Sequence, residues 1–403
     1  MNILFLSPES PYPPDHGHHL RSYNLLKLLS NNNKIFFLGF VKNKRELEYK
    51  HELKKFCATV DLLLIPVGKW RWRLFLSLFL NLFSPLPFTV QKYVRTEASQ
   101  RIRQILKENR IDLVHVDLLH MGTYYKDIRQ IPKILDNHNV ESLRMLRWAK
   151  IEKNAFMKLY LYLQYFKLYH FEKNICSKFD KCTVVSDFDK EELMKMSPKA
   201  SFVTIPNGVD IEYFKPQNGE SEAHSLVWTG GLRDVNNRNA VHYFLHEILP
   251  LIQTKIPDVK VSIVGGAPTP ELLKQAQENP NIKAVGYVED VRPYMQRAMV
   301  FIAPLKSGSG TKLKVLNALS LGNAVVTTSI GAEGIKVINN ENIIIADDPQ
   351  EFADKTVYLL ENPEIARKMG EKARRVVEKY YDWEIIGHKI RKEYHEVSQG
   401  SET

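Results

Sequence analysis

The sequence is poor in cysteine and has no long hydrophobic run. Its 403 residues include three cysteines, Cys57, Cys176 and Cys182, with no C-x-x-C pair and no metal-ligand spacing. This usage fits a reducing cytosol and thiols that are mostly buried. No segment offers 18 uninterrupted apolar residues, so we expect no membrane-spanning helix. Residues 1–8 lack a basic start and predict a first β-strand, not a signal peptide.

The overall composition is that of a globular protein with two domains. Hydrophobic residues make up 44% and charged residues 25% of the chain, which is ordinary for a soluble protein. A length of 403 residues exceeds one ordinary core and favours two domains of roughly 200 residues. The formal net charge of +10 suggests an anionic partner, which could be a nucleotide, an anionic lipid headgroup or a nucleic acid.

Short apolar runs alternate with helical patterns along the whole chain, which predicts α/β units with parallel sheets. The turn cluster at 206–210 separates two similar halves. Two such halves suggest a ligand cleft between them, at the carboxyl ends of the strands. The expected strands are 2–6, 34–41, 60–66, 111–116, 133–136, 183–186 and 202–205, then 225–229, 259–264, 282–285, 300–303, 324–328 and 342–346.

The segment 308–322 is the most informative part of the chain. Glycines at 308 and 310 precede Thr311, which we expect to cap a helix that carries Lys312 and Lys314 in its first turn. Free backbone N–H groups and the positive end of the helix dipole favour a phosphate group there. A plain capped turn with two solvated lysines is the alternative. The segment matches neither G-x-G-x-x-G nor the P-loop pattern.

Two apolar helices need separate interpretations. Residues 70–83 combine tryptophan and arginine with leucine and phenylalanine, which suits either a helix at a membrane surface or one packed on the N-terminal sheet. The aromatic stripe of 155–171 predicts a core helix.

Several motifs in order resemble those of retaining GT-B glycosyltransferases of family 4. The resemblance covers nearly the whole chain and is strongest from Pro206 onward. Within the family, the chain is most similar to bacterial enzymes that build polysaccharides and other cell-surface glycans. The motifs are 205–210, Trp228-Thr229-Gly230-Gly231, Ile263-Val264-Gly265-Gly266, 285–288, the loop and helix at 308–322, Gly331-Ala332-Glu333-Gly334 and Tyr380-Tyr381-Asp382-Trp383.

The resemblance implies an α/β GT-B fold, in which two Rossmann-like, doubly wound domains face a central cleft. We expect an acceptor-side domain at 1–206 and a nucleotide-sugar-binding domain at 207–380. Residues 381–403 are expected to form a helix and tail that cross back to the first domain.

Two segments of the first half match the acceptor side of these enzymes. Residues 10–17 with Arg21 match their first loop, where Gly17 lets the backbone approach the substrates. Residues 135–142 match the segment that places a histidine near the transferred sugar, which makes His138 the candidate catalytic residue. A hydrogen-bonded core histidine is the alternative. Glu141 is an acceptor-side candidate, or equally a carboxylate stabilised by the start of a helix.

On the donor side the chain departs from the family pattern at two places. The family has two glutamates eight positions apart, where this chain has Ser309 and Asn317. Asparagine is neutral, so its hydrogen bonds to ribose hydroxyls would be weaker. The arginine that follows the glycine in many relatives is replaced by Gly231, with Arg233 displaced. The implied donor-binding residues are Gly230, Gly231, Arg233, Gly265, Ser309, Gly310, Thr311, Lys312, Lys314, Asn317 and Glu333.

The implied reaction moves a sugar from a nucleoside diphosphate sugar to a hydroxyl acceptor with retention. We expect no cofactor and no metal, because lysines and helix N–H groups can stabilise the departing diphosphate. The expected partners are the donor, a glycan or lipid-linked acceptor and an anionic membrane contacted through 70–83, with no nucleic acid. The expected location is the cytoplasm, with peripheral contact at the inner face of the plasma membrane as an open alternative. The alternatives are a nucleotide-sugar 2-epimerase, a phosphorylase and a catalytically silent sugar-nucleotide-binding protein.

Overall fold

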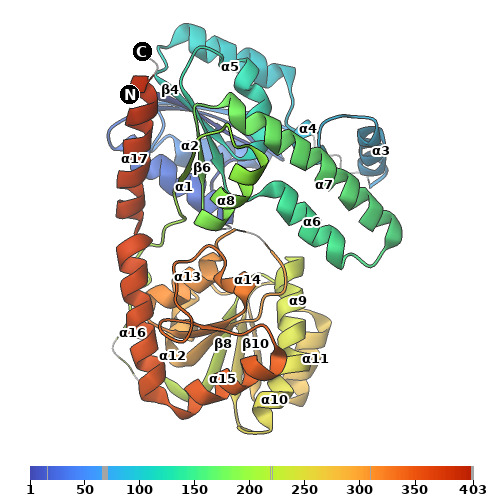
Figure 1. The fold of residues 1–403 in the computed structure, drawn as a ribbon, viewed down its shortest axis with the longest axis vertical. Coiled ribbons are helices and arrows are strands. Elements are labelled where there is room, and N and C mark those ends of the chain that lie inside the picture. The colour runs from blue at the N-terminus through green and yellow to red at the C-terminus, as the bar shows by residue number, and fades with distance from the viewer. Residues whose placement is uncertain (16, 66–70, 218, 220, 309, 401–403) are drawn as a thin grey trace. The chain divides into compact units, whose positions relative to one another are not determined.

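The computed structural model describes residues 1–15, 17–65, 71–217, 219, 221–308 and 310–400, with the backbone alone at 71–73. The chain divides into two compact units. Unit 1 comprises 1–206 and 386–403, and unit 2 comprises 207–385. Each unit is an α/β layer structure built on one parallel sheet (Figure 1).

The sheet of unit 1 has the order β3-β2-β1-β4-β5-β6-β7 among the described residues, and all its pairings are parallel. Nearly every residue of β1, β2, β4 and β5 is buried, because helices cover both faces of a parallel sheet. The strands are β1 Asn2–Ser7, β2 Lys34–Val41, β3 Thr59–Leu64, β4 Leu113–Asp117, β5 Lys133–Asn137, β6 Lys181–Val184 and β7 Phe202–Thr204. These strands confirm the seven expected from the sequence.

The helices of unit 1 occupy the connections between these strands. They are α1 Gly17–Ser30, α2 Lys50–Leu53, α3 Arg71–Leu82, α4 Phe88–Gln91, α5 Thr96–Glu108, α6 Glu141–Ile151, α7 Ala155–Ile175 and α8 Asp187–Met196. The chain leaves β1 toward β2 and β3 on one side and later returns to β4 on the other side. The carboxyl ends of β1 and β4 therefore flank a topological switch point, where ligands of α/β proteins commonly bind.

Unit 2 repeats this plan with the order β10-β9-β8-β11-β12-β13, whose switch point lies between β8 and β11. Its strands are β8 Glu222–Thr229, β9 Lys260–Val264, β10 Ile282–Gly286, β11 Ala298–Ala303, β12 Ala324–Thr327 and β13 Ile344–Ile345. Its helices are α9 Val235–Tyr243, α10 Leu249–Gln253, α11 Pro270–Glu278, α12 Arg292–Arg297, α13 Leu313–Ser320, α14 Ser329–Ala332, α15 Pro349–Glu361 and α16 Pro363–Tyr380.

The last helix, α17 (Trp383–Gln399), begins in unit 2, and its residues from Ile386 onward belong to unit 1. In unit 1 the Tyr394 hydroxyl contacts Nδ1 of the buried His115, and Lys181 Nζ lies 2.6 Å from a Glu393 carboxylate oxygen. This confirms the expected helix that crosses back to the first domain.

Helix α7 packs on the core of unit 1, but not with the face that its aromatic stripe suggested. Phe156 and Leu159 are 88% and 71% exposed, whereas the buried face holds Leu161, Gln164, Leu168 and Glu172. The prediction was wrong because large side chains occur all around this helix, so the buried face cannot be recognised from their spacing. Among the described residues, no helix is both long and apolar enough to cross a bilayer.

Candidate functional site

A buried polar network lies at the switch point of unit 1. It consists of Arg21 from α1, Asp117 at the end of β4, Asp136 in β5 and His138 just after β5. Arg21 donates from Nε and Nη2 to the two carboxylate oxygens of Asp136, at 2.9 and 2.8 Å, and from Nη1 to the Pro206 carbonyl at 3.0 Å. His138 Nε2 lies 2.9 Å from Asp117 Oδ1 and 3.2 Å from Asp136 Oδ2.

The network holds two positive and two negative charges in a buried place. Burial opposes the charge on His138, but Asp117 and Asp136 overcome it and raise the histidine pKa to about 9. Burial also opposes the charges on the aspartates, yet His138 lowers the pKa of Asp117, and Arg21 with His138 lowers that of Asp136 further. Ser7 and Ser22 hydroxyls donate to Asp117 Oδ2, at 2.7 and 2.8 Å. His138 is therefore an imidazolium near neutral pH, suited to donate a proton in a hydrogen bond and not to accept one.

The other acceptor-side candidates lie near the starts of α1 and α6. Gly17 is the exposed first residue of α1. Glu141 is buried in the first turn of α6, where it accepts hydrogen bonds from Arg144 Nε and Nη2 at 3.0 and 2.6 Å. The α6 start is capped by another residue, because Glu172 of α7 accepts from the N–H groups of Glu141 and Ser142, at 2.6 and 3.0 Å. An acceptor role for Gly17, Arg21 and Glu141 stays a prediction.

In unit 2, Lys314 lies against the loop that follows β8. Its Nζ donates to Asn237 Oδ1 at 2.7 Å and lies 4.2 Å from the Trp228 ring centre, and the Asp234 carboxylate acts on it electrostatically. A Cβ atom on Gly230 would come within 2.4 Å of this Nζ, so the glycine makes room for the lysine. Burial lowers the pKa of Lys314 to about 7. Gly265 lets the backbone pack closely against the same loop, because a Cβ atom at this position would lie 1.8 Å from the Gly230 carbonyl oxygen.

The start of α13 differs from the expectation in one respect. The N-cap residue is Lys312 and not Thr311, and the Lys312 side chain makes no capping hydrogen bond. The Thr311 hydroxyl is buried without a hydrogen-bond partner among the described residues. Thr311 precedes the cap by one position, so its side chain does not reach the first-turn N–H groups. The Val315 N–H donates to the Lys312 carbonyl at 2.9 Å, whereas the N–H groups of Leu313 and Lys314 donate to none of the described residues. Such N–H groups can bind an anion.

The remaining donor-side candidates lie in several segments of unit 2. Lys312 Nζ donates to the carbonyl of Gly310 at 2.6 Å, and Gly310 has a positive φ of 67° that favours glycine. Asn317 is half-buried in α13 and Glu333 follows α14. Gly231 and Arg233 are exposed. Ser309 lies outside the described residues. The role of each of these residues in donor binding stays a prediction.

A third feature of unit 1 is an exposed apolar surface on α3 and the first half of α7, called here the α3–α7 surface. In α3 the burial pattern is inverted: the polar Asn81 is fully buried, whereas the described apolar side chains other than the half-buried Leu78 are exposed. Asn81 Oδ1 accepts from Gln164 Nε2 of α7 at 2.8 Å, which fixes this end of α3 beside α7 (Figure 1). The exposed apolar residues are Leu74, Phe75, Leu76, Phe79, Leu80, Leu82, Phe83, Phe156, Met157, Leu159 and Phe166. Trp70 and the side chain of Trp72 lie outside the described residues.

The sequence did not lead us to predict Asp117 and Asp136, the two aspartates that keep His138 protonated. Each ends or nearly ends a buried strand, and an acidic residue in such an apolar run is a signal that could have been used. We also did not predict Trp228 and Asn237 as the partners of Lys314. An Asp-x-Asp pattern occurs at Asp187 and Asp189, at the start of α8, where Ser186 Oγ accepts from the Asp189 N–H at 3.0 Å.

Two Rossmann-like units with parallel sheets, and a last helix that returns to the first unit, define the GT-B architecture. A protein from Anabaena crystallised with UDP, HepE, shares this fold with a TM-score of 0.68 at 14% identity, over 97% of this chain and 99% of its own. The chain belongs to the group 1, family 4 glycosyltransferases. The family model "Glycosyl transferases group 1" matches residues 223–362, and the model "Glycosyltransferase Family 4" matches residues 77–213.

Two relatives indicate the kind of glycosyltransferase that this chain resembles. An uncharacterised 44.6 kDa protein in the cps region of Klebsiella pneumoniae is 26% identical over 97% of this chain and 99% of its own length. The phosphatidyl-myo-inositol mannosyltransferase of Mycolicibacterium smegmatis is 26% identical over 49% of this chain and 52% of its own length. These matches support glycosyltransferase activity of the kind used in polysaccharide biosynthesis.

Proposed function

We propose that this chain transfers a sugar from a nucleoside diphosphate sugar to a hydroxyl acceptor with retention, in the synthesis of a cell-surface glycan. The observation that carries the proposal is the start of α13, which has no side-chain cap and has Lys314 in its first turn against Gly230. Uncapped N–H groups and an ammonium whose contacts, Asn237 and Trp228, are uncharged suit a diphosphate. HepE, which shares the fold, has also been crystallised with UDP-glucose.

In the proposed reaction, negative charge grows on the diphosphate as the glycosidic bond breaks. Lys312, Lys314 and the α13 N–H groups stabilise that charge more in the transition state than in the ground state. These groups supply the positive charge, so we propose that the donor is held without a metal or another cofactor. His138, as an imidazolium, donates a hydrogen bond to a sugar or acceptor oxygen.

The donor site is tested by thermal unfolding of the full chain with UDP-, GDP-, ADP- and TDP-linked compounds. A nucleotide at about 100 times its dissociation constant stabilises its site by about 2.7 kcal/mol. We expect one base to raise the melting temperature and Lys314→Met to abolish the effect. The exposed Lys260, which pairs with Glu222 at 2.6 Å, gives the matched control Lys260→Met. No shift with any compound would contradict donor binding.

Asn317 separates the proposed enzyme from the silent sugar-nucleotide-binding alternative. We expect Asn317→Glu to tighten donor binding, because a carboxylate accepts stronger hydrogen bonds from ribose hydroxyls. Binding without turnover over a broad set of acceptors would favour the silent protein, and a 2-epimerase would interconvert the donor sugar with no acceptor present. Glycosidic product of retained configuration, identified by NMR, supports the transferase.

We propose that the α3–α7 surface rests on an anionic membrane at the cytoplasmic face. Residues 71–96 contain four lysines or arginines and no acidic residue, so the apolar side chains are accompanied by positive charge. The acceptor would then be a lipid-linked glycan presented at that surface.

Liposome flotation tests this contact. The double variant Phe79→Ser/Phe156→Ser is expected to lose binding to vesicles with anionic lipid, and the wild type is expected to bind vesicles of neutral lipid more weakly. Tyr287, 79% exposed in unit 2, gives the control Tyr287→Ser. Equal flotation of the double variant and the wild type would remove this surface from the proposal.

A further inference from the structure

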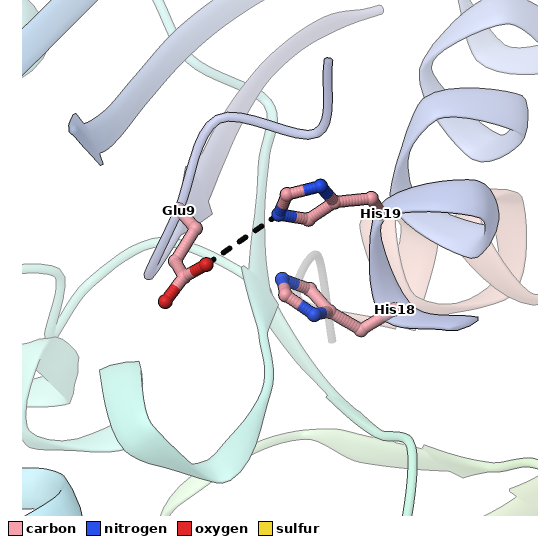
Figure 2. A group of neighbouring side chains, drawn as sticks. All are labelled: Glu9, His18 and His19. Carbon is pink, nitrogen blue, oxygen red and sulfur yellow. Dashed lines mark ion pairs between the residues drawn. The ribbon is translucent and has the colours of Figure 1, made fainter. Parts of the chain in front are cut away.

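Three metal-ligating side chains meet in unit 1 beside the buried network. Glu9 lies in the loop after β1, and His18 and His19 lie in the first turn of α1. One ligand atom from each lies within 4.8 Å of the other two. Figure 2 shows a nitrogen of each imidazole ring turned toward the Glu9 carboxylate. The arrangement brings two nitrogen ligands and one oxygen ligand to one place.

The contacts around these side chains already orient them. His19 Nδ1 lies 3.0 Å from the Pro13 carbonyl oxygen, so the proton on Nδ1 is donated there and Nε2 faces Glu9 at 3.5 Å. Metal-binding histidines are commonly held in this way, with the second ring nitrogen donating to a carbonyl. The Tyr93 hydroxyl donates to Glu9 Oε1 at 3.3 Å, which holds the carboxylate in turn.

The surroundings leave room for a further ligand. A cavity of about 210 Å³ is lined by Glu9, Asp15 and His19 together with Ser10, Tyr12 and Tyr93. A site with three protein ligands and an open side is the pattern of zinc sites that take a water or a substrate oxygen.

The ammonium group of Lys42 already pairs with Glu9 at this site. Its Nζ lies 2.9 Å from Glu9 Oε2, and its side chain is 54% exposed. A metal ion would have to displace this ammonium from the carboxylate, which an exposed lysine allows by turning into solvent. Ligands bound at about 2.0 to 2.1 Å in a tetrahedron lie about 3.4 Å apart, so the three side chains must also close slightly.

We propose that Glu9, His18 and His19 bind a divalent transition-metal ion of the zinc class, with an open coordination position toward the cavity. Two imidazoles and one carboxylate favour such an ion over magnesium or calcium, which prefer oxygen ligands. The site belongs to unit 1 alone and shares no residue with the proposed diphosphate site. It is tested with the metal alone, so its failure would leave the proposed glycosyl transfer untouched.

The test is zinc binding to the full chain, without an affinity tag of histidines, by calorimetry after treatment with a chelator. A second cluster, His242 and His246 with Glu271, is exposed in unit 2 and could also take up zinc. All variants are therefore made in a His242→Ala/His246→Ala background. We expect one equivalent of zinc to bind in that background, and cobalt to give the visible absorption of a four-coordinate site.

Single changes then assign the ligands. Glu9→Gln and His19→Ala are each expected to weaken zinc binding at least tenfold, whereas His388→Ala, at an exposed histidine of α17, leaves it unchanged. Lys42→Met keeps all three ligands and removes the competing ammonium, so it is expected to tighten binding. The absence of zinc binding in the background protein, or binding that Glu9→Gln and His19→Ala leave unchanged, would overturn the proposal. Weaker or unchanged binding in Lys42→Met would also count against it.

Discussion

The charge on His138 is the property of the structure that can be tested most directly. Its Nε2 lies between Asp117 and Asp136, at 2.9 and 3.2 Å, in a buried place. These carboxylates raise its pKa from 6.5 to about 9. A change of this size corresponds to about 3 kcal/mol of interaction in favour of the protonated form.

The sign of the effect on stability follows from the direction of the change. The folded state holds the proton more tightly than the unfolded state, so the contribution of His138 is fully present below pH 6.5. It is lost as the pH rises through about 9. We therefore expect unit 1 to weaken between pH 6.5 and 9 by about 3 kcal/mol, and this loss to be absent in His138→Gln.

Two measurements check this prediction. NMR titration of the labelled histidine rings, with His138 assigned by its loss in His138→Gln, is expected to give a pKa near 9. Hydrogen exchange of the β4 and β5 amides is expected to report the loss of stability within unit 1, where a global unfolding curve would mix the two units.

The partners of His138 provide a further comparison. Asp117→Asn removes one carboxylate and is expected to lower the His138 pKa, whereas His388→Ala leaves it unchanged. A ring that titrates near 6.5 in the wild type would refute the charged network. The proposed role of His138 as a hydrogen-bond donor would then also lose its basis.

Three further predictions concern the helix starts and glycines. Glu172→Ala leaves the buried N–H groups of Glu141 and Ser142 without an acceptor and is expected to cost about 2 to 3 kcal/mol. Reduced hydrogen-exchange protection of α6 measures this loss, and Glu172→Gln is expected to lose less. Binding of a nucleoside diphosphate at pH 7.5 is expected to take up a proton at Lys314, whose pKa of about 7 rises beside an anion. Calorimetry in two buffers of different ionisation enthalpy detects the uptake, which Lys314→Met abolishes. Gly265→Ala is expected to destabilise the protein by about 3 kcal/mol in thermal unfolding, because its Cβ would lie 1.8 Å from a backbone oxygen.

The sheets were predictable because parallel strands buried on both faces read as short apolar runs. The strands at 34–41 and 298–303 follow this rule closely. Helix α7 was not predictable from its own spacing. Phe156 and Leu159 would normally indicate a core, and only the structure shows that they are exposed. The error at Thr311 is of another kind, since the cap position differs by one residue and sequence signals rarely fix a helix start that closely.

A candidate site could be predicted where its residues lie together in one segment of the sequence. Lys312 and Lys314 predict an anion site because they share a short sequence with the glycines and the helix start, and this site stays a prediction. The charge on His138 could not be foreseen in the same way. Its partners Asp117 and Asp136 come from two strands, and only the pairing of β4 with β5 brings them together.

The two switch points differ in charge, and this difference separates their proposed ligands. At the switch point of unit 1, Arg21 and His138 are balanced by Asp117 and Asp136, all four buried. At that of unit 2, Lys314 contacts the uncharged side chains of Asn237 and Trp228, beside helix N–H groups that no side chain caps. A balanced network accommodates a neutral polar group such as a sugar hydroxyl, whereas an unbalanced ammonium at a helix start favours a phosphate. This difference supports the proposal that the diphosphate binds to unit 2 and that the uncharged hydroxyls of the transfer bind to unit 1.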